Sequence, residues 1–390
     1  MSPLKISWKS LWSKPLSAAL NIMLVAFGTG ILTILLLASK QIGDKLENNA
    51  KDIDLVVGAK GSPLQLILSS IYYIDFPTGN IPLKEAMELA RSPFVKRAVP
   101  LALGDNYNGI RIVGTDSNFV SLYHLQTKQG KFWQQDFEAT VGSAVAKAEK
   151  LKVGDTFNGA HGLTGSSDIH ESHHYKVTGI LETQGNVTDN LILTNIASVW
   201  KMHDEHENDI PRELTSLLIQ YRSPMSVAMF PRMVNETTNM QAASPAQEST
   251  RLFSLIGVGV DTLQWFAVLI MLISAISVFV NLYNSLKERN YDLAIMRTLG
   301  ASRTKLFLIV IAEGMMLTLA GTIIGITLGH LALEFIGKNQ ESSQAQLTGF
   351  VLLYDEIYLF FTGLAIGIFA AILPAIQAYR SNISKILAKN

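Results

Sequence analysis

The chain has 390 residues, of which 48% are hydrophobic and only 16% charged, with 32 basic and 32 acidic residues and no cysteine. A net charge of zero gives no global basic field, so we expect no nucleic-acid partner. The lack of cysteine excludes disulfides, cysteine-ligated zinc, iron–sulfur clusters and thiol catalysis. A charge content this low in a chain of this length indicates membrane segments.

Four apolar stretches are each long enough to cross about 30 Å of hydrocarbon at about 1.5 Å per residue. They carry almost no charge, apart from Glu313, His330 and Glu334 in the third stretch. The alternative, buried helices of a soluble core, is weaker because basic residues cluster just outside the stretches. The predicted membrane helices are 15–39, 262–286, 306–335 and 357–379.

Lysine and arginine near the ends of these stretches predict the orientation. The arm 1–14, the loop 287–305 and the tail 380–390 are basic, whereas the loop 336–356 has one lysine against three acids. The positive-inside rule therefore places both termini and the loop 287–305 in the cytoplasm and residues 40–261 outside. The arm also carries Leu4, Trp8, Leu11 and Trp12 on one helical face, which predicts an amphipathic helix at the membrane interface.

Residues 40–261 predict a large mixed α/β domain, with a second lobe at about 125–215 where polar turns are frequent. The fold class is therefore an α-helical membrane protein with four transmembrane helices and this domain between the first and second. The predicted strands are Ile53–Val57, Val95–Leu103, Gly109–Gly114, Ala139–Val141, His174–Leu181, Asn190–Thr194 and Ser216–Tyr221, and the predicted helices are Pro63–Ile71, Leu83–Arg91, Asn118–His124, Ser143–Glu149, Ile196–His203 and Ser226–Met240. Residues 249–261 are predicted to be helical and continuous with the second membrane helix.

Two of the membrane helices have faces of small residues. Gly321, Gly325 and Gly329 repeat every fourth residue in the third, and Gly363 and Gly367 do so in the fourth. Such faces let helix backbones approach closely in lipid. The alternative, that glycine is simply common in membrane helices, is weaker for three glycines in register.

The loop 287–305 predicts a short helix with an apolar ridge of Ile295, Met296 and Leu299. Gly300 can end this helix in a left-handed cap, and Ser302 can then N-cap the third membrane helix. A short helix with an apolar ridge and charged flanks is suited to docking in a groove of another protein. The alternative is a solvated loop that only balances the topology.

This loop resembles the coupling region of the FtsX-like/MacB-like permease family. The end of the fourth membrane helix agrees, with Pro374-Ala-Ile-Gln-Ala-Tyr-Arg380, although members often have proline just after this arginine and this chain has Ile383 near that place. The resemblance covers the membrane part closely and the outer domain loosely. The residues it assigns to contact with an ATPase are Glu288, Arg289, Ala294, Arg297, Leu299 and Gly300.

The resemblance implies a bacterial inner-membrane machine of two permeases, a copy or a paralogue of this chain, and two ABC ATPase subunits. The ATPases bind ATP with Mg²⁺, and their motion passes through the membrane helices to the outer domain by mechanotransmission. Such systems export or extract varied cargo, at times with a periplasmic or outer-membrane partner. The chain itself is expected not to be an enzyme, because G-x-x-x-x-G-K-[ST] is absent and Gly58-Ala-Lys-Gly-Ser62 has the wrong spacing.

Histidines offer two further hypotheses. His170-Glu171-Ser172-His173-His174 spells the H-E-x-x-H pattern of zinc proteases, but residues 174–180 alternate like a strand, which makes a membrane metalloprotease the weakest reading. A zinc site without protease chemistry is a stronger alternative, because imidazole suits Zn²⁺. The candidate ligands are His170, His173, His174, His203 and His206.

Overall fold

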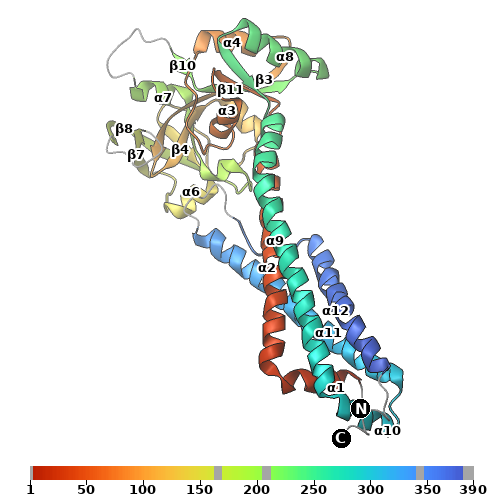
Figure 1. The fold of residues 1–390 in the computed structure, drawn as a ribbon. Coiled ribbons are helices and arrows are strands. Elements are labelled where there is room, and N and C mark those ends of the chain that lie inside the picture. Colours follow the sequence, from red (N-terminus) through yellow and green to blue (C-terminus); the bar gives the residue numbers. More distant parts are fainter. Residues whose placement is uncertain (1–2, 162–168, 204–211, 340–346, 381–390) are drawn as a thin grey trace. The chain divides into compact units, whose positions relative to one another are not determined.

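The fold is known from a computed structural model (Figure 1), in which the chain divides into two compact units, a helical membrane unit and an α/β domain. The structure describes residues 3–161, 169–203, 212–339 and 347–380.

The membrane unit comprises Met1–Ile42, Ile256–Glu341 and Gln346–Asn390. Among the described helices, four are long and apolar enough to cross a membrane. Two of these continue well beyond the apolar stretches, and the long one before the coupling loop includes residues 249–261, as predicted. The helices with residues in this unit are α1 (Pro3–Ser13), α2 (Pro15–Asn49), α9 (Pro245–Glu288), α10 (Asn290–Thr298), α11 (Arg303–Asn339) and α12 (Asp355–Tyr379).

Glycines set how closely α2 and α12 approach α11. A Cβ atom at Gly325 would lie 2.5 Å from the Ala26 carbonyl oxygen of α2, and one at Gly321 would lie 2.6 Å from Cβ of Val25. Gly329 faces Thr33 of α2 in the same way. A side chain has no room at these positions, so the α2 and α11 backbones are in direct contact.

The same arrangement joins α12 to α11. Gly363 faces Thr322, and Gly367 faces Thr318 and the Gly314 carbonyl oxygen of α11. Thr318 donates its hydroxyl hydrogen to the carbonyl oxygen of Gly314 at 3.1 Å, so this buried hydroxyl is satisfied within its own helix. The five predicted packing glycines therefore all lie at helix–helix contacts.

The α/β domain, Gly43–Leu255 with Ser342–Ala345, is built on a mixed sheet. In the described part the strand order is β12-β1-β11-β3-β4-β9-β6-β8-β5, β7 pairs with β3 and β8, and β2 pairs with β10. The β4–β9 and β6–β8 pairs are parallel and the others are antiparallel. The strands are β1 (Leu55–Ala59), β2 (Ile81–Pro82), β3 (Val95–Tyr107), β4 (Ile110–Thr115), β5 (Thr127–Gly130), β6 (Glu138–Val141), β7 (Thr156–His161), β8 (Ile169–Leu181), β9 (Ile192–Asn195), β10 (Glu213–Leu214), β11 (Ser216–Tyr221) and β12 (Met240–Ala243).

Short helices cover this sheet, and side-chain caps mark the start of two of them. Ser62 accepts a hydrogen bond from the Gln65 backbone N–H at the start of α3, and Asp116 accepts one from Asn118 at the start of α5. Apolar side chains such as Phe119 and Phe230 fill the core beneath them. The helices are α3 (Pro63–Ser70), α4 (Leu83–Ala90), α5 (Ser117–Leu122), α6 (Ser143–Ala148), α7 (Ile196–His203) and α8 (Pro224–Thr237), and Val187–Asn190 forms a 3₁₀ turn.

Strands β5 to β9 of the predicted lobe 125–215 belong to the same sheet as β3 and β4, because β9 pairs with β4 and β7 with β3. The longest strand of this part, β8, has 13 residues, as many as β3. The second lobe itself stays a prediction.

A glycine-to-alanine pair tests the helix contact. We expect Gly325→Ala to destabilise the membrane unit by about 1–3 kcal/mol, because its methyl group would overlap Thr29 and the Ala26 carbonyl oxygen of α2. Gly257→Ala in α9 is the matched control: no atom lies within 4 Å of its added Cβ, and alanine favours a helix by about 1 kcal/mol. Thermal unfolding in detergent, followed by circular dichroism, measures both, and equal melting temperatures would contradict the contact.

Candidate coupling site

The short helix α10 lies between the two membrane helices α9 and α11, and its end is well defined. Gly300 has φ of +97°, a left-handed conformation that suits glycine. Its N–H donates to the Arg297 carbonyl oxygen at 3.1 Å, and the Ala301 N–H donates to the Met296 carbonyl oxygen at 2.9 Å. These two bonds form a Schellman cap. Ser302 then caps α11 by accepting from the Lys305 N–H at 3.2 Å.

An ion pair fixes the start of α10 to α11. The Arg289 Nη1 atom lies 2.9 Å from Oε1 of Glu313, and both side chains are largely buried. The same Nη1 donates to the hydroxyl of Ser10 in α1. Glu313, which lies about two turns into the third apolar stretch, is therefore paired with an arginine of the coupling loop.

The arm α1 is part of this site. Ser7 is fully buried, and its hydroxyl donates to the Ile309 carbonyl oxygen of α11 at 2.9 Å. Lys14, which follows α1, pairs with Glu288 at the end of α9. Trp8 and Trp12 remain exposed. The arm therefore packs on α11 through Ser7, while its tryptophans stay at the surface of the unit.

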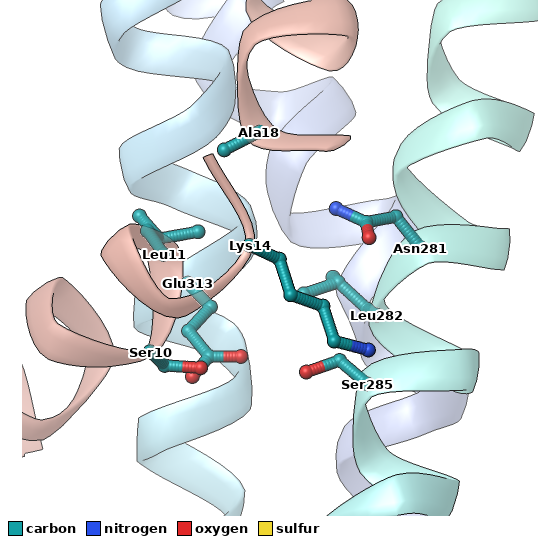
Figure 2. Close-up of a pocket in the computed structure, with 8 residues that line it drawn as sticks. All are labelled: Ser10, Leu11, Lys14, Ala18, Asn281, Leu282, Ser285 and Glu313. Carbon is teal, nitrogen blue, oxygen red and sulfur yellow. The ribbon is translucent and has the colours of Figure 1, made fainter. Parts of the chain in front are cut away.

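A small pocket marks the point where α1, α9 and α11 meet (Figure 2). Its volume is about 10 Å³, room for about one water molecule. Figure 2 shows Glu313 beside Ser10, and Lys14 extending past them toward Ser285 of α9. This pocket is too small for a substrate, so its polar groups hold the helices together.

A larger apolar groove lies beside the α10 cap. Its volume is about 250 Å³, below the roughly 300–1,000 Å³ of small-molecule sites. Leu299 borders it with 82% of its surface exposed. The groove thus has the size for an inserted side chain of another protein. Its lining residues are Ile6, Met296, Leu299, Gly300, Ala301, Lys305 and Ile309.

The structure divides the six residues that the sequence assigned to ATPase contact. Glu288, Leu299 and Gly300 are exposed and available to a partner. Arg297 is half-buried, and its guanidinium lies near the Ala301 carbonyl oxygen. Ala294 is buried and Arg289 is paired with Glu313, so these two act inside the permease unit. Sequence reasoning grouped them because all six lie in one short loop.

Sequence reasoning missed the contribution of the arm to this site. Ser7, Ser10, Lys14 and Ile6 contact residues that lie more than 270 positions further along the chain. No local spacing reveals such pairs. The only signal was that the arm is basic and Glu288 is acidic.

Models of two protein families match the chain. The model of the MacB-like periplasmic core domain matches residues 18–236, more than half of the chain, and that of the FtsX-like permease C-terminal region matches residues 265–383. The chain belongs to the FtsX-like/MacB-like family of ABC transporter permeases. The FtsX match contains α10 and the whole of α11 and α12, so the site described above lies largely in the family's shared part.

Curated relatives agree with this assignment. The chain is 22% identical over 394 residues to the pyoverdine export ATP-binding/permease protein PvdT of Pseudomonas fluorescens strain Pf0-1, covering 94% of this chain and 55% of that protein. It is 22% identical over 266 residues to the lipoprotein-releasing system transmembrane protein LolC of Buchnera aphidicola subsp. Schizaphis graminum, covering 66% of this chain and 64% of that protein. The chain spans about half the length of the first curated relatives it matches.

The comparison with solved structures finds matches to two domains. The periplasmic region of MacB from Actinobacillus actinomycetemcomitans is 10% identical, covers 53% of this chain and 97% of that one, and has a TM-score of 0.36. The extracellular domain of the noncanonic ABC-type transporter YknZ from Gram-positive bacteria is 12% identical, covers 49% of this chain and 99% of that one, and has a TM-score of 0.32.

The histidines of the candidate metal site lie on different elements, and the side chain of His170 is outside what the structure describes. His170, His173 and His174 lie in β8, a strand, where residues four apart are separated by about 13 Å. The helical H-E-x-x-H arrangement of a protease is therefore absent. The His173 ring stacks on Phe137, and His174 bonds to Asn158. His203 ends α7, His206 lies outside the described residues, and no group of three or more potential ligands occurs in the ranges that the structure covers.

Two ion pairs of the site provide a prediction about how α10 is held. We expect Glu313→Gln and Arg289→Gln each to destabilise the unit by about 1–3 kcal/mol, since each leaves a largely buried partner without its charge-assisted hydrogen bond. The double variant should lose less stability than the sum of the losses in the two single variants, and the difference is a coupling energy of about 0.5–3 kcal/mol. The exposed Lys14–Glu288 pair is the control, with an expected coupling below about 1 kcal/mol.

Chemical denaturation in detergent micelles measures both cycles. A coupling energy for Arg289–Glu313 no larger than that of the control pair would show that the buried pair does not fasten α10.

Proposed function

We propose that this chain is the permease subunit of an ABC-type complex in which a separate ATPase docks on α10. ATP-driven motion of that ATPase passes through the membrane helices to the α/β domain, for export or extraction of an unidentified cargo. Family membership supports the permease role. The observation that carries the docking proposal is the exposed Leu299 beside an apolar groove. The helix α10 that precedes it is fixed at both ends, by the ion pair of Arg289 at its start and by the Gly300 cap at its end.

The geometry of α10 suits transmission as well as docking. Leu293 and Ala294 are buried on its inner face, while Leu299 projects outward. Leu293 packs in one apolar cluster with Leu306 and Ile309 of α11. A force on Leu299 thus reaches α11 through packed side chains and the Arg289–Glu313 pair, with no flexible segment between them.

The proposed assembly has two permeases, either two copies of this chain or one copy and a paralogue, and two ATPase subunits that bind ATP with Mg²⁺. The proposed assembly needs an ATPase part that lies outside these 390 residues, which contain no Walker-type phosphate loop; PvdT is named as an ATP-binding/permease protein. The basic charge of the loop and the arm supports a cytoplasmic location of α10 and of both termini of this sequence in a bacterial cell, where ATP is available.

Changing Leu299→Asp tests docking. An aspartate would have to be desolvated on entering an apolar contact, so we expect at least a tenfold loss of a P-loop ATPase that co-purifies with the tagged permease from its native membrane, and a matching loss of ATP hydrolysis. Met225→Asp is the matched control: it places the same charge at an exposed apolar position of α8, in the α/β domain.

Retention of the ATPase by the Leu299→Asp variant, or equal loss in the Met225→Asp control, would contradict docking at α10. Far-UV circular dichroism and gel filtration of both variants confirm that neither change unfolds the permease.

A further inference from the structure

The segment that leads into α12 exposes a continuous apolar run. Residues 350–354 read Phe-Val-Leu-Leu-Tyr. Phe350, Leu352 and Tyr354 are 81%, 80% and 89% exposed. Exposed apolar patches on a protein mark contact with a membrane or another molecule. We call these three residues the finger.

The backbone just before the finger, at Thr348 and Gly349, is hydrogen-bonded to side chains of the membrane helices α2 and α11. Gln41 of α2 exchanges two hydrogen bonds with Thr348, one of 2.8 Å to its carbonyl oxygen and one of 2.9 Å from its N–H. Glu334 of α11 accepts from the Gly349 N–H and from the Thr348 hydroxyl, both at 3.0 Å. His330 lies 3.0 Å from the Glu356 carboxylate, which in turn accepts from the Leu353 N–H.

Close packing adds to these bonds. A Cβ atom at Gly349 would overlap the His330 carbonyl oxygen, so the segment lies directly on the α11 backbone. The exposure of the finger is therefore a fixed feature of the unit, and the bonds that fix it come from elements far apart in the sequence.

The position of the finger in the membrane unit indicates what covers it. It lies in the chain between α11 and α12, two candidate membrane helices with exposed apolar side chains at the ends that adjoin it. Lys338 and Asp355, both exposed, flank it and require water or head groups. Aromatic residues between an apolar band and charged groups are typical of the bilayer interface. The exposed apolar residues at the adjoining ends of α11 and α12 are Leu331, Phe335, Ile357, Tyr358 and Phe361.

We propose that Phe350, Leu352 and Tyr354 insert into the interfacial region of the bilayer and contact lipid acyl chains, at the end of α11 opposite to α10. The backbone suits this depth. The Phe350 N–H donates to the Thr348 hydroxyl at 3.2 Å and the Leu353 N–H to Glu356 at 2.9 Å, and head groups and water can satisfy what remains. The finger thus anchors this end of α11 to one leaflet. The proposal stands independently of ATPase docking.

The cysteine-free chain allows single nitroxide labels to test the finger. Leu352→Cys and Tyr354→Cys variants are labelled one at a time and reconstituted in vesicles of phosphatidylethanolamine and phosphatidylglycerol. Collision rates with oxygen, which concentrates in lipid, and with a nickel chelate, which stays in water, are then measured by electron paramagnetic resonance. Phe361→Cys in α12 is the lipid control, and Lys84→Cys, exposed in α4 of the α/β domain, is the water control.

We expect both finger labels to favour oxygen over the nickel chelate, as the Phe361 label does. Nickel collision rates equal to those of the Lys84 label would overturn the proposal. Spectral broadening that disappears on dilution with unlabelled permease would also overturn it, because a second copy would then cover the finger. Gln41→Ala should increase the mobility of the Leu352 label severalfold, and an unchanged line shape would show that Gln41 does not hold the segment.

Discussion

The membrane unit depends on the ion pair between Arg289 and Glu313. Two charges that are largely removed from water are costly to separate, because each would remain buried without a partner. Since the same guanidinium also bonds to Ser10, one side chain holds together the arm α1, the short helix α10 and the membrane helix α11. This explains why an acidic residue is placed inside an otherwise apolar membrane helix.

In the proposed complex, a displacement of α10 would be passed on to α11 and to the helices packed against it. Glycines bring α11 close to both α2 and α12, with only small or branched side chains such as Val25, Thr33 and Thr322 at the contacts. The far end of α11 is tied to α2 once more, through Gln41, Glu334 and Thr348. A displacement of α10 in the proposed complex therefore acts on a packed group of helices that reaches from the cap at Gly300 to the finger.

The sequence predicted the parts of this architecture that depend on local patterns. The length of the apolar stretches predicted the four membrane helices, and the spacing of glycines predicted the small-residue faces of α11 and α12. The alternation of apolar and polar residues predicted strands such as Ser216–Tyr221 with the observed bounds. The sequence did not show which base of the coupling loop pairs with Glu313, or that Lys14 pairs with Glu288. Such contacts depend on how segments that are distant in the chain meet in the fold. Nor could the sequence predict the parallel pairing of β4 with β9, which links segments about 80 residues apart.

The most direct test of the account is a cross-link from the α10 cap. A Leu299→Cys variant carrying a photoactivatable reagent should cross-link, in its native membrane, to a protein with a P-loop ATPase sequence, and trapping the ATP-bound state should change the yield. A Phe350→Cys variant, at the opposite end of α11, should not label that protein. Labelling of no ATPase from Leu299, or equal labelling from both positions, would contradict the proposed coupling through α10.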